Sequence, residues 1–191
     1  MKVIITGAPQ SGQQQLFSLL TGIPLETIQQ KPLEPQVGIC EVKDPRVTKL
    51  IDLFKPKKQA YARIEYMLLP DFNLQGPAKE LIFNQLKNAD EICWVTRSES
   101  DISSFISELV IFDLLLVEKR VENIERGLRS RASEANEKEK DFLLTLKKEL
   151  DAERLLQKFS FSDNQLKALK AYQFMTLKPV ILAVNVAEEQ I

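Results

Sequence analysis

The amino-acid sequence predicts an α/β fold, in which a mostly parallel sheet is flanked by helices and an antiparallel helical hairpin is inserted between two strands. Three observations predict this class. Short apolar runs alternate with helical segments through the first 100 residues, as expected for a parallel sheet covered on both faces. A glycine-containing loop follows the first apolar run. Between Pro77 and Pro179 the sequence has one glycine, Gly127, and no proline, which indicates long uninterrupted helices.

The apolar runs and the segments between them set the order of elements in the first part. Runs typical of buried strands cover residues 2–6, 37–42, 61–69 and 91–96, and a fifth covers residues 179–184. Helices are expected to begin at residue 16 and to cover residues 44–53 and 78–87. We expect the resulting sheet to bury Val3, Ile5, Ile39, Ile64, Trp94, Val95, Ile181 and Val184.

A helical insertion separates the last strand from the others. We therefore expect the α/β domain to comprise residues 1–100 and 175–191, and the insertion, a hairpin followed by a return helix, to comprise residues 101–174. The first hairpin helix carries the 3-4-3-4 spacing of a coiled-coil seam, formed by Leu114, Val117, Val121, Ile124 and Leu128. Residues 130–136 predict the tip, and residues 137–158 a second helix with Leu143, Leu146 and Leu150 on one stripe.

Composition excludes several classes of function. The 191 residues include no histidine, which argues against histidine-based catalytic triads, the usual zinc sites and pH switches near neutrality. The formal net charge of −1 argues against a general nucleic-acid-binding protein. No apolar stretch reaches the length of a membrane span, and the N-terminus does not have the pattern of a secretory signal. We therefore expect a cytoplasmic protein with no membrane partner.

The loop after the first strand is the predicted phosphate-binding site. It matches the pattern G-x-x-x-x-G-K-[S/T] at both glycines. Its predicted phosphate-binding residues are Gly7, Ala8, Pro9, Gln10, Ser11, Gly12, Gln13 and Gln14. A functional loop adds a lysine charge on the phosphates and a hydroxyl group on Mg²⁺, but Gln13 and Gln14 stand at those two positions. A glycine-containing turn that caps a helix is the simpler alternative for this segment.

Other short motifs surround this loop in a specific order. They are Glu34-Pro35, Asp44-Pro45-Arg46, Lys55-Pro56, Thr176-Leu177-Lys178-Pro179 and Asn185-Val186-Ala187-Glu188. With the loop and the hairpin, they make the chain resemble, over essentially its whole length, the YchF family of Obg-like ATPases within the translation-factor-related P-loop GTPases. The resemblance implies a P-loop NTPase fold with a Ras-like or Obg-like G domain, ATP or GTP as the ligand, and base binding by Asn185 and Glu188. The alternative for these two residues is a polar strand end followed by an acidic loop.

The chain departs from that family at the positions that handle Mg²⁺ and the γ-phosphate. Besides Gln13 and Gln14, Leu68 stands at the position of the Mg²⁺-associated aspartate, and Pro32 at that of the switch threonine. Asp71 is the acid that could replace the aspartate. Loss of one strong electrostatic contact typically costs about 10²–10³ in rate. The departures therefore predict a degenerate pseudo-GTPase without catalytic or metal-binding residues, in which nucleotide binding is weak and independent of Mg²⁺ and no cofactor is required.

Several functions remain open from the sequence. The chain could bind an unknown protein partner through the hairpin or the former switch surface. It could be a nucleotide hydrolase that uses Asp71 or a group supplied in trans. It could also be a ribosome- or RNA-associated factor, as the resemblance and the basic residues Lys55, Lys57, Lys58 and Arg63 suggest. The hairpin could stabilise only itself, or its seam could pair in a homodimer. Because the family's domain continues beyond the point that corresponds to Ile191, we expect a C-terminally short member, natural or truncated.

Overall fold

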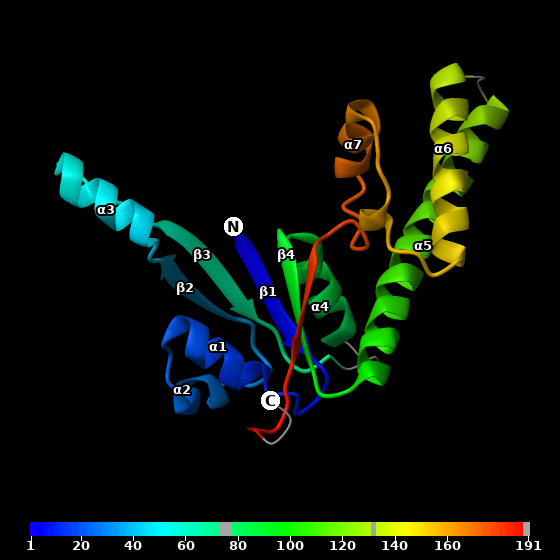
Figure 1. Cartoon of the computed structure of the whole chain (residues 1–191). Coiled ribbons are helices and arrows are strands. Elements are labelled where there is room, and N and C mark those ends of the chain that lie inside the picture. The colour runs from blue at the N-terminus through cyan, green and yellow to red at the C-terminus, as the bar shows by residue number, and fades with distance from the viewer. Residues whose placement is uncertain (73–77, 131–132, 189–191) are drawn as a thin grey trace. The chain divides into compact units, whose positions relative to one another are not determined.

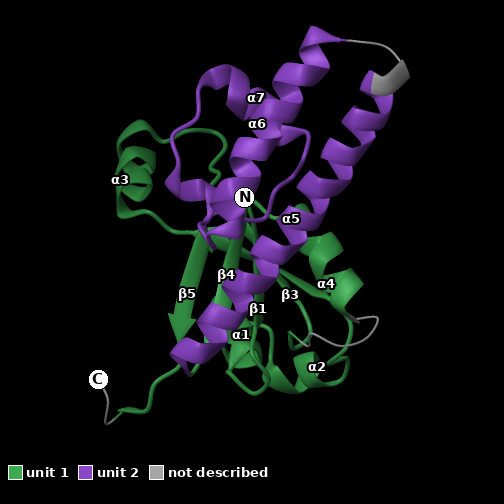
Figure 2. Cartoon of the chain, turned by 90° about the vertical axis from the view of Figure 1, so that its right-hand side faces the viewer, with its two compact units in different colours: residues 1–97, 180–191 green, residues 98–179 purple. Residues whose placement is uncertain are grey.

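The computed structural model describes residues 1–72, 78–130 and 133–188 (Figure 1). The chain separates into two compact units. Unit 1 comprises residues 1–97 and 180–191, and unit 2 comprises residues 98–179 (Figure 2). The boundaries predicted from the sequence were after residues 100 and 174. Each unit has its own hydrophobic core and is described by itself below.

Unit 1 is built on a five-stranded sheet with the order β2-β3-β1-β4-β5. The strands are β1 (Lys2–Gly7), β2 (Gln36–Val42), β3 (Ala62–Leu68), β4 (Glu91–Thr96) and β5 (Val180–Val184). Strand β2 runs antiparallel to β3, and all other neighbouring pairs are parallel, which confirms the mostly parallel sheet. The carboxyl ends of β1, β3, β4 and β5 therefore lie at one edge of the sheet, where open α/β folds place their ligand sites.

Helices cover both faces of this sheet. The covering helices are α1 (Gln13–Thr21), α2 (Leu25–Gln29) and α4 (Ala78–Lys87), whereas α3 (Pro45–Phe54) has no buried residue. Phe17 of α1 and Ile28 of α2 share a core cluster with Val3 and Ile5 of β1. Figure 1 shows α4 on the opposite side of the sheet from α1. The five-residue helix α2 was not predicted, because it is too short to show a helical period.

The expected burial of the sheet is right for the central strands and wrong for the edges. Val3, Ile5, Trp94 and Val95 are buried, and Ile64 is half-buried. By contrast, Ile39 is 60% exposed, Ile181 45% and Val184 52%. The physical reason is the strand order, because β2 and β5 are the two edge strands and each has a neighbour on only one side. Apolar runs of this kind do not tell a central strand from an edge strand.

Unit 2 consists of two long helices and a shorter return segment. These elements are α5 (Glu99–Ser130), α6 (Glu134–Asp151), a 3₁₀ turn at Leu156–Lys158 and α7 (Asp163–Lys170). The side chains of the predicted seam lie in the core of this unit. Its buried side chains include Val117, Ile124, Leu143, Leu146 and Leu150, and Leu114, Val121 and Leu128 pack against them partly buried.

The bounds predicted for the second hairpin helix are wrong at both ends. The helix α6 begins at Glu134, because Ser133 is extended and serves as the N-cap residue. The predicted tip, residues 130–136, was therefore too long. It ends at Asp151. Glu153 then has a φ of 54°, a left-handed conformation in which the helix cannot continue. Within the described residues, no helix is both long enough and apolar enough to cross a membrane.

A buried carboxylate fastens the return segment of unit 2 to α5. Asp113 is fully buried, and its two oxygens accept hydrogen bonds from the Met175 amide at 3.0 Å, the Thr176 amide at 2.8 Å and the Thr176 hydroxyl at 2.6 Å. Burial raises the pKa of Asp113, and the three donated hydrogen bonds act in the opposite direction. The segment before β5 is thus held in place by one side chain from the middle of α5.

Candidate functional site

The backbone of residues 7–14 is held by backbone hydrogen bonds, both within the loop and to β4. The Ala8 amide donates to the Val95 carbonyl at 3.2 Å, and the Ser11 amide donates to the Ala8 carbonyl at 3.1 Å. Gly12 has a φ of 102°, which side-chain-bearing residues rarely adopt. A Cβ atom on Gly7 would lie 2.3 Å from the Val95 carbonyl oxygen. Both glycines are therefore required by the shape of the loop, whatever it binds.

The loop leads directly into the first turn of α1. The first amide groups of a helix have no carbonyl partner within the helix and carry the positive end of its dipole. At this point a phosphate-binding loop normally offers amides to an anion. The loop is thus followed by a helix N-terminus, as the phosphate-binding pattern requires. The side chains around it decide what the site can do chemically.

Gln13, at the lysine position, has both ends of its amide bonded within the protein. It is 3% exposed. The Ser11 hydroxyl donates to the Gln13 carbonyl oxygen at 2.6 Å, and the Gln13 amide nitrogen donates to the carboxylate of Asp71. Burial raises the pKa of Asp71, while the hydrogen bond from Gln13 lowers it. A lysine here would extend a charge towards a phosphate, whereas the Gln13 side chain is hydrogen-bonded to Ser11 of the loop and to Asp71 after β3.

Asp71 reaches the loop because it follows β3, the parallel neighbour of β1. Leu68, at the family's aspartate position, is 4% exposed and belongs to the hydrophobic core of unit 1. It therefore has neither the atoms nor the placement to hold a metal ion. Pro32 lies exposed in the turn between α2 and β2. Among the described residues, no group of three or more Asp, Glu or Cys side chains is gathered in a way that suits a metal ion.

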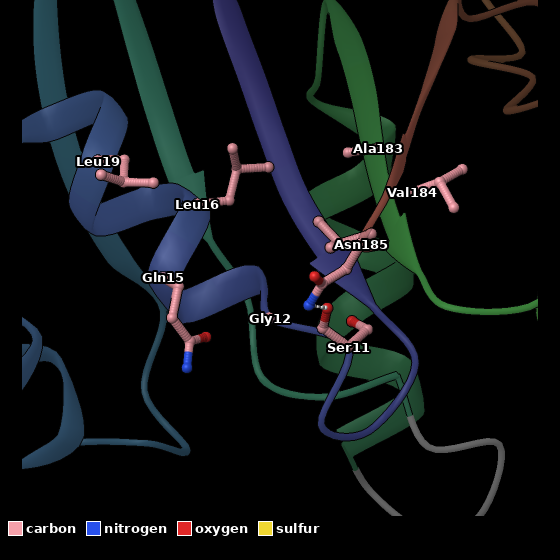
Figure 3. A pocket seen from close by; sticks show the side chains of 9 residues that line it. Ser11, Gly12, Gln15, Leu16, Leu19, Ala183, Val184 and Asn185 are labelled. Carbon is pink, nitrogen blue, oxygen red and sulfur yellow. Dashed lines mark hydrogen bonds between the residues drawn. The ribbon is translucent and has the colours of Figure 1, made fainter. Parts of the chain in front are cut away.

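Two pockets adjoin the loop, both within unit 1. The first, of about 210 Å³, is largely aliphatic and lies between the loop, α1 and the end of β5 (Figure 3). Its lining includes Ser11, Gly12, Leu16, Leu19, Ala183, Val184 and Asn185. The second, of about 360 Å³, is more polar and is lined by Gln10, Gly12, Gln13, Gln14, Gln15, Asp71 and Arg97. The loop therefore has an apolar side and a polar side.

Asn185, predicted to bind a base, lies against the loop itself. Its side-chain amide donates to the Ser11 carbonyl at 2.8 Å, as the dashed line in Figure 3 marks, and its backbone amide donates to the Thr96 carbonyl at 2.8 Å. A Cβ atom on Gly12 would come within 2.6 Å of the Asn185 amide nitrogen. In this structure the residue braces the loop and closes one wall of the aliphatic pocket.

Glu188, the second predicted base-binding residue, is exposed and lines neither pocket. The structure thus brings together the loop, Asn185 and Asp71, and leaves Glu188 apart. It also adds Arg97, a residue absent from the site predicted by the sequence. A signal for Arg97 was available, since it directly follows a parallel strand and the carboxyl ends of such strands meet at one edge.

Unit 2 carries a separate groove of about 870 Å³ between α5, α6 and α7. Its lining includes Phe142, Ala168 and Tyr172. At its side the Arg120 guanidinium donates to both Glu139 oxygens, at 2.8 and 3.1 Å, and the Tyr172 hydroxyl donates to the same carboxylate. The hydrogen bonds from Arg120 are the main cause of a lowered pKa of Glu139. Three lining residues of the groove, Arg120, Glu139 and Tyr172, are therefore joined by hydrogen bonds.

Comparison with known proteins supports the predicted resemblance. No family model matches the chain. It is 27% identical over 209 residues to the protein named ribosome-binding ATPase YchF of Bacillus subtilis, covering 98% of this chain and 57% of the relative. It is 28% identical to the protein of the same name from Mycoplasma pneumoniae, covering 96% and 56%. The solved structure of the Schizosaccharomyces pombe YchF GTPase superimposes with a TM-score of 0.76 at 22% identity, covering 100% of this chain and 57% of that one. The structural match confirms the predicted fold, and the chain spans a little over half the length of these relatives.

Proposed function

Since this chain is a YchF-like member of the P-loop GTPases and ATPases, we propose that it is a pseudo-GTPase, with weak nucleotide binding and no efficient hydrolysis, that acts as a protein-interaction module. The observation that carries the proposal is the placement of Gln13. Its amide stands where the family's lysine would be, and it bonds Ser11 on one side and Asp71 on the other. The charge that would stabilise a transferring phosphoryl group is therefore replaced by an internal hydrogen-bond network.

The surroundings of Mg²⁺ are altered as well. Gln14 offers no hydroxyl group, Leu68 lies in the core, and the Asp71 carboxylate accepts a hydrogen bond from Gln13. Hydrolysis in P-loop proteins depends on an ion that bridges the β- and γ-phosphate oxygens. Without ligands to hold that ion, we expect neither stronger binding in Mg²⁺ nor turnover. A hydrolase that used Asp71 as its metal ligand would first have to break the contact with Gln13.

Phosphate release tests this proposal. The whole chain, incubated with ATP or GTP and Mg²⁺, is expected to release no phosphate above the uncatalysed background. The double variant Gln13→Lys with Gln14→Ser restores the two side chains of the loop motif. It should bind ATP more tightly, yet remain without efficient turnover, because Leu68 and Pro32 are unchanged. Gln59→Lys, which adds the same charge to an exposed loop, is the matched control. Multiple turnovers by the unmodified chain would overturn the proposal.

The groove of unit 2 is the surface that we propose for protein contacts. Its lining combines the apolar side chains of Phe142, Ala168 and Tyr172 with the charged side chains of Arg120 and Lys138. Protein-binding surfaces commonly combine aromatic side chains and arginine in this way. Arg120 is held by Glu139, so its position is fixed before a partner arrives. Ordered side chains of this kind lose less conformational entropy on binding.

Ribosome association is a second candidate, favoured by the names of the relatives, which are called ribosome-binding. Co-sedimentation with purified ribosomes at about 50 and about 200 mM salt tests it, since phosphate contacts weaken steeply over that range. Lys57→Glu with Lys58→Glu probes the basic cluster of unit 1, and Lys138→Glu probes the groove. Loss of binding in one variant alone would assign the contact to that unit. Absence of co-sedimentation at either salt concentration would exclude this candidate.

A further inference from the structure

The polar pocket beside the loop contains a positive charge that does not come from the loop. Among the described residues that line this pocket of about 360 Å³, Arg97 is the cationic one, and Asp71 is the acidic one. The other lining residues are Gly12 and four glutamines. In the phosphate-binding pattern the cation stands within the loop, at the position of Gln13. Here it stands at the end of a different strand.

The backbone that carries Arg97 is fixed next to the loop. Arg97 directly follows β4, which pairs in parallel with β1 from Glu91 to Val95. Just before it, the Val95 carbonyl accepts from the Ala8 amide, and the Thr96 carbonyl accepts from the Asn185 amide. Hydrogen bonds from Ala8 and Asn185 therefore fix the backbone immediately before Arg97. The side chain is exposed and belongs to unit 1, as does every other residue of the pocket.

We propose that Arg97 is the phosphate-binding cation of this site and replaces the charge that Gln13 lacks. The ligand is the polyphosphate chain of a nucleoside di- or triphosphate, bound without Mg²⁺. A guanidinium group is always charged at physiological pH and presents several N–H donors in a plane that suits two phosphate oxygens at once. It can therefore neutralise a polyphosphate directly, beside the amides at the start of α1.

This inference rests on the proposed pseudo-GTPase function and gives it a chemical basis. Gln13 and Asp71 satisfy each other, so the loop needs no bound ligand to complete the hydrogen bonds of Gln13. A cation outside the loop can attract phosphate, but it has no lysine or metal beside it to stabilise charge on a leaving group. The site would then bind a nucleotide and not cleave it.

Titration calorimetry of the full chain in EDTA, with ATP and with inorganic tripolyphosphate as probes, tests the role of Arg97. Arg97→Gln should weaken the affinity for both probes by about 10-fold or more, as expected when a hydrogen bond from a charged group is lost. Arg97→Lys should retain part of the affinity, since it keeps the charge and loses the planar geometry. Lys49→Gln, on α3 and outside the pocket, should bind like the unmodified chain. Thermal melting of each variant checks that it is folded.

The outcomes separate this inference from the function on which it rests. Unchanged affinity in Arg97→Gln, or no binding of either probe by the unmodified chain, overturns the role of Arg97 and leaves the pseudo-GTPase proposal standing. Turnover of ATP by the unmodified chain that is lost in Arg97→Gln would support the role of Arg97 and overturn the pseudo-GTPase proposal. Weaker binding in Arg97→Gln without turnover in any variant supports both.

Discussion

The loop of unit 1 and the hairpin of unit 2 use polar groups in opposite ways. The loop takes its shape from backbone hydrogen bonds and from Gly7 and Gly12, while its polar side chains bond one another. In unit 2, a buried polar side chain, Asp113, joins the return segment to α5, beside the apolar seam that joins α5 to α6. A loop shaped by its backbone can lose its chemical groups and keep its fold. Where a buried side chain such as Asp113 joins two segments, its substitution is expected to cost stability.

The largest expected effect is that of Gly7→Ala in the loop. The new Cβ atom would lie 2.3 Å from the Val95 carbonyl oxygen and 2.7 Å from the Ser11 hydroxyl. The backbone of β4 has to move to accept it, so we expect a loss of about 3 kcal/mol in the free energy of unfolding. Urea unfolding followed by circular dichroism measures the change. Gly127→Ala is the control, because nothing lies within 4 Å of a Cβ atom there and the helix should gain slightly. Equal stability of Gly7→Ala and the unmodified chain would contradict the claim that backbone contacts shape the loop.

The next effect concerns the carboxylate that fastens unit 2. Asp113→Asn removes one of the two oxygens that accept from Met175 and Thr176, and places an N–H group against these donors. Because the site is buried, we expect a cost of about 2 kcal/mol in the free energy of unfolding. Asp141→Asn on the exposed face of α6 is the control and should change stability little. If the two variants were equally stable, Asp113 would not join the return segment to α5 as described.

The smallest effect is at the groove, and it depends on pH. Hydrogen bonds from Arg120 lower the pKa of Glu139 in the folded chain. Its contribution to stability is therefore present above its unfolded pKa of about 4.3 and is lost as the pH falls through the lower folded pKa. Glu139→Gln should cost about 1 kcal/mol at pH 7 and progressively less below about pH 4.

Melting temperatures of the unmodified chain and Glu139→Gln across this pH range test the sign. Glu137→Gln, exposed on the same helix, serves as the control. A gap between Glu139→Gln and the unmodified chain that grew on acidification would contradict the assignment of Arg120 as the partner that stabilises ionised Glu139.

Local patterns predicted the elements well, and contacts distant in sequence account for most of what they missed. Residues 78–87 and 91–96 were predicted with the bounds that α4 and β4 have, because breakers and apolar runs mark them. The exposure of Ile39 and Val184 depends on strand order, which such runs do not encode. Likewise, the contact between Gln13 and Asp71 joins residues 58 positions apart. The loop was visible in the sequence, whereas the partner of Gln13 required the fold.

The central claim is that the loop keeps its shape without the groups that hold a metal-bound nucleotide. Titration calorimetry of the unmodified chain with ATP, in the presence and absence of Mg²⁺, tests it most directly. We predict weak binding with the same affinity in both conditions. Mg²⁺-dependent binding with a dissociation constant of about 1 μM or below, equivalent to about −8.2 kcal/mol, would contradict this claim.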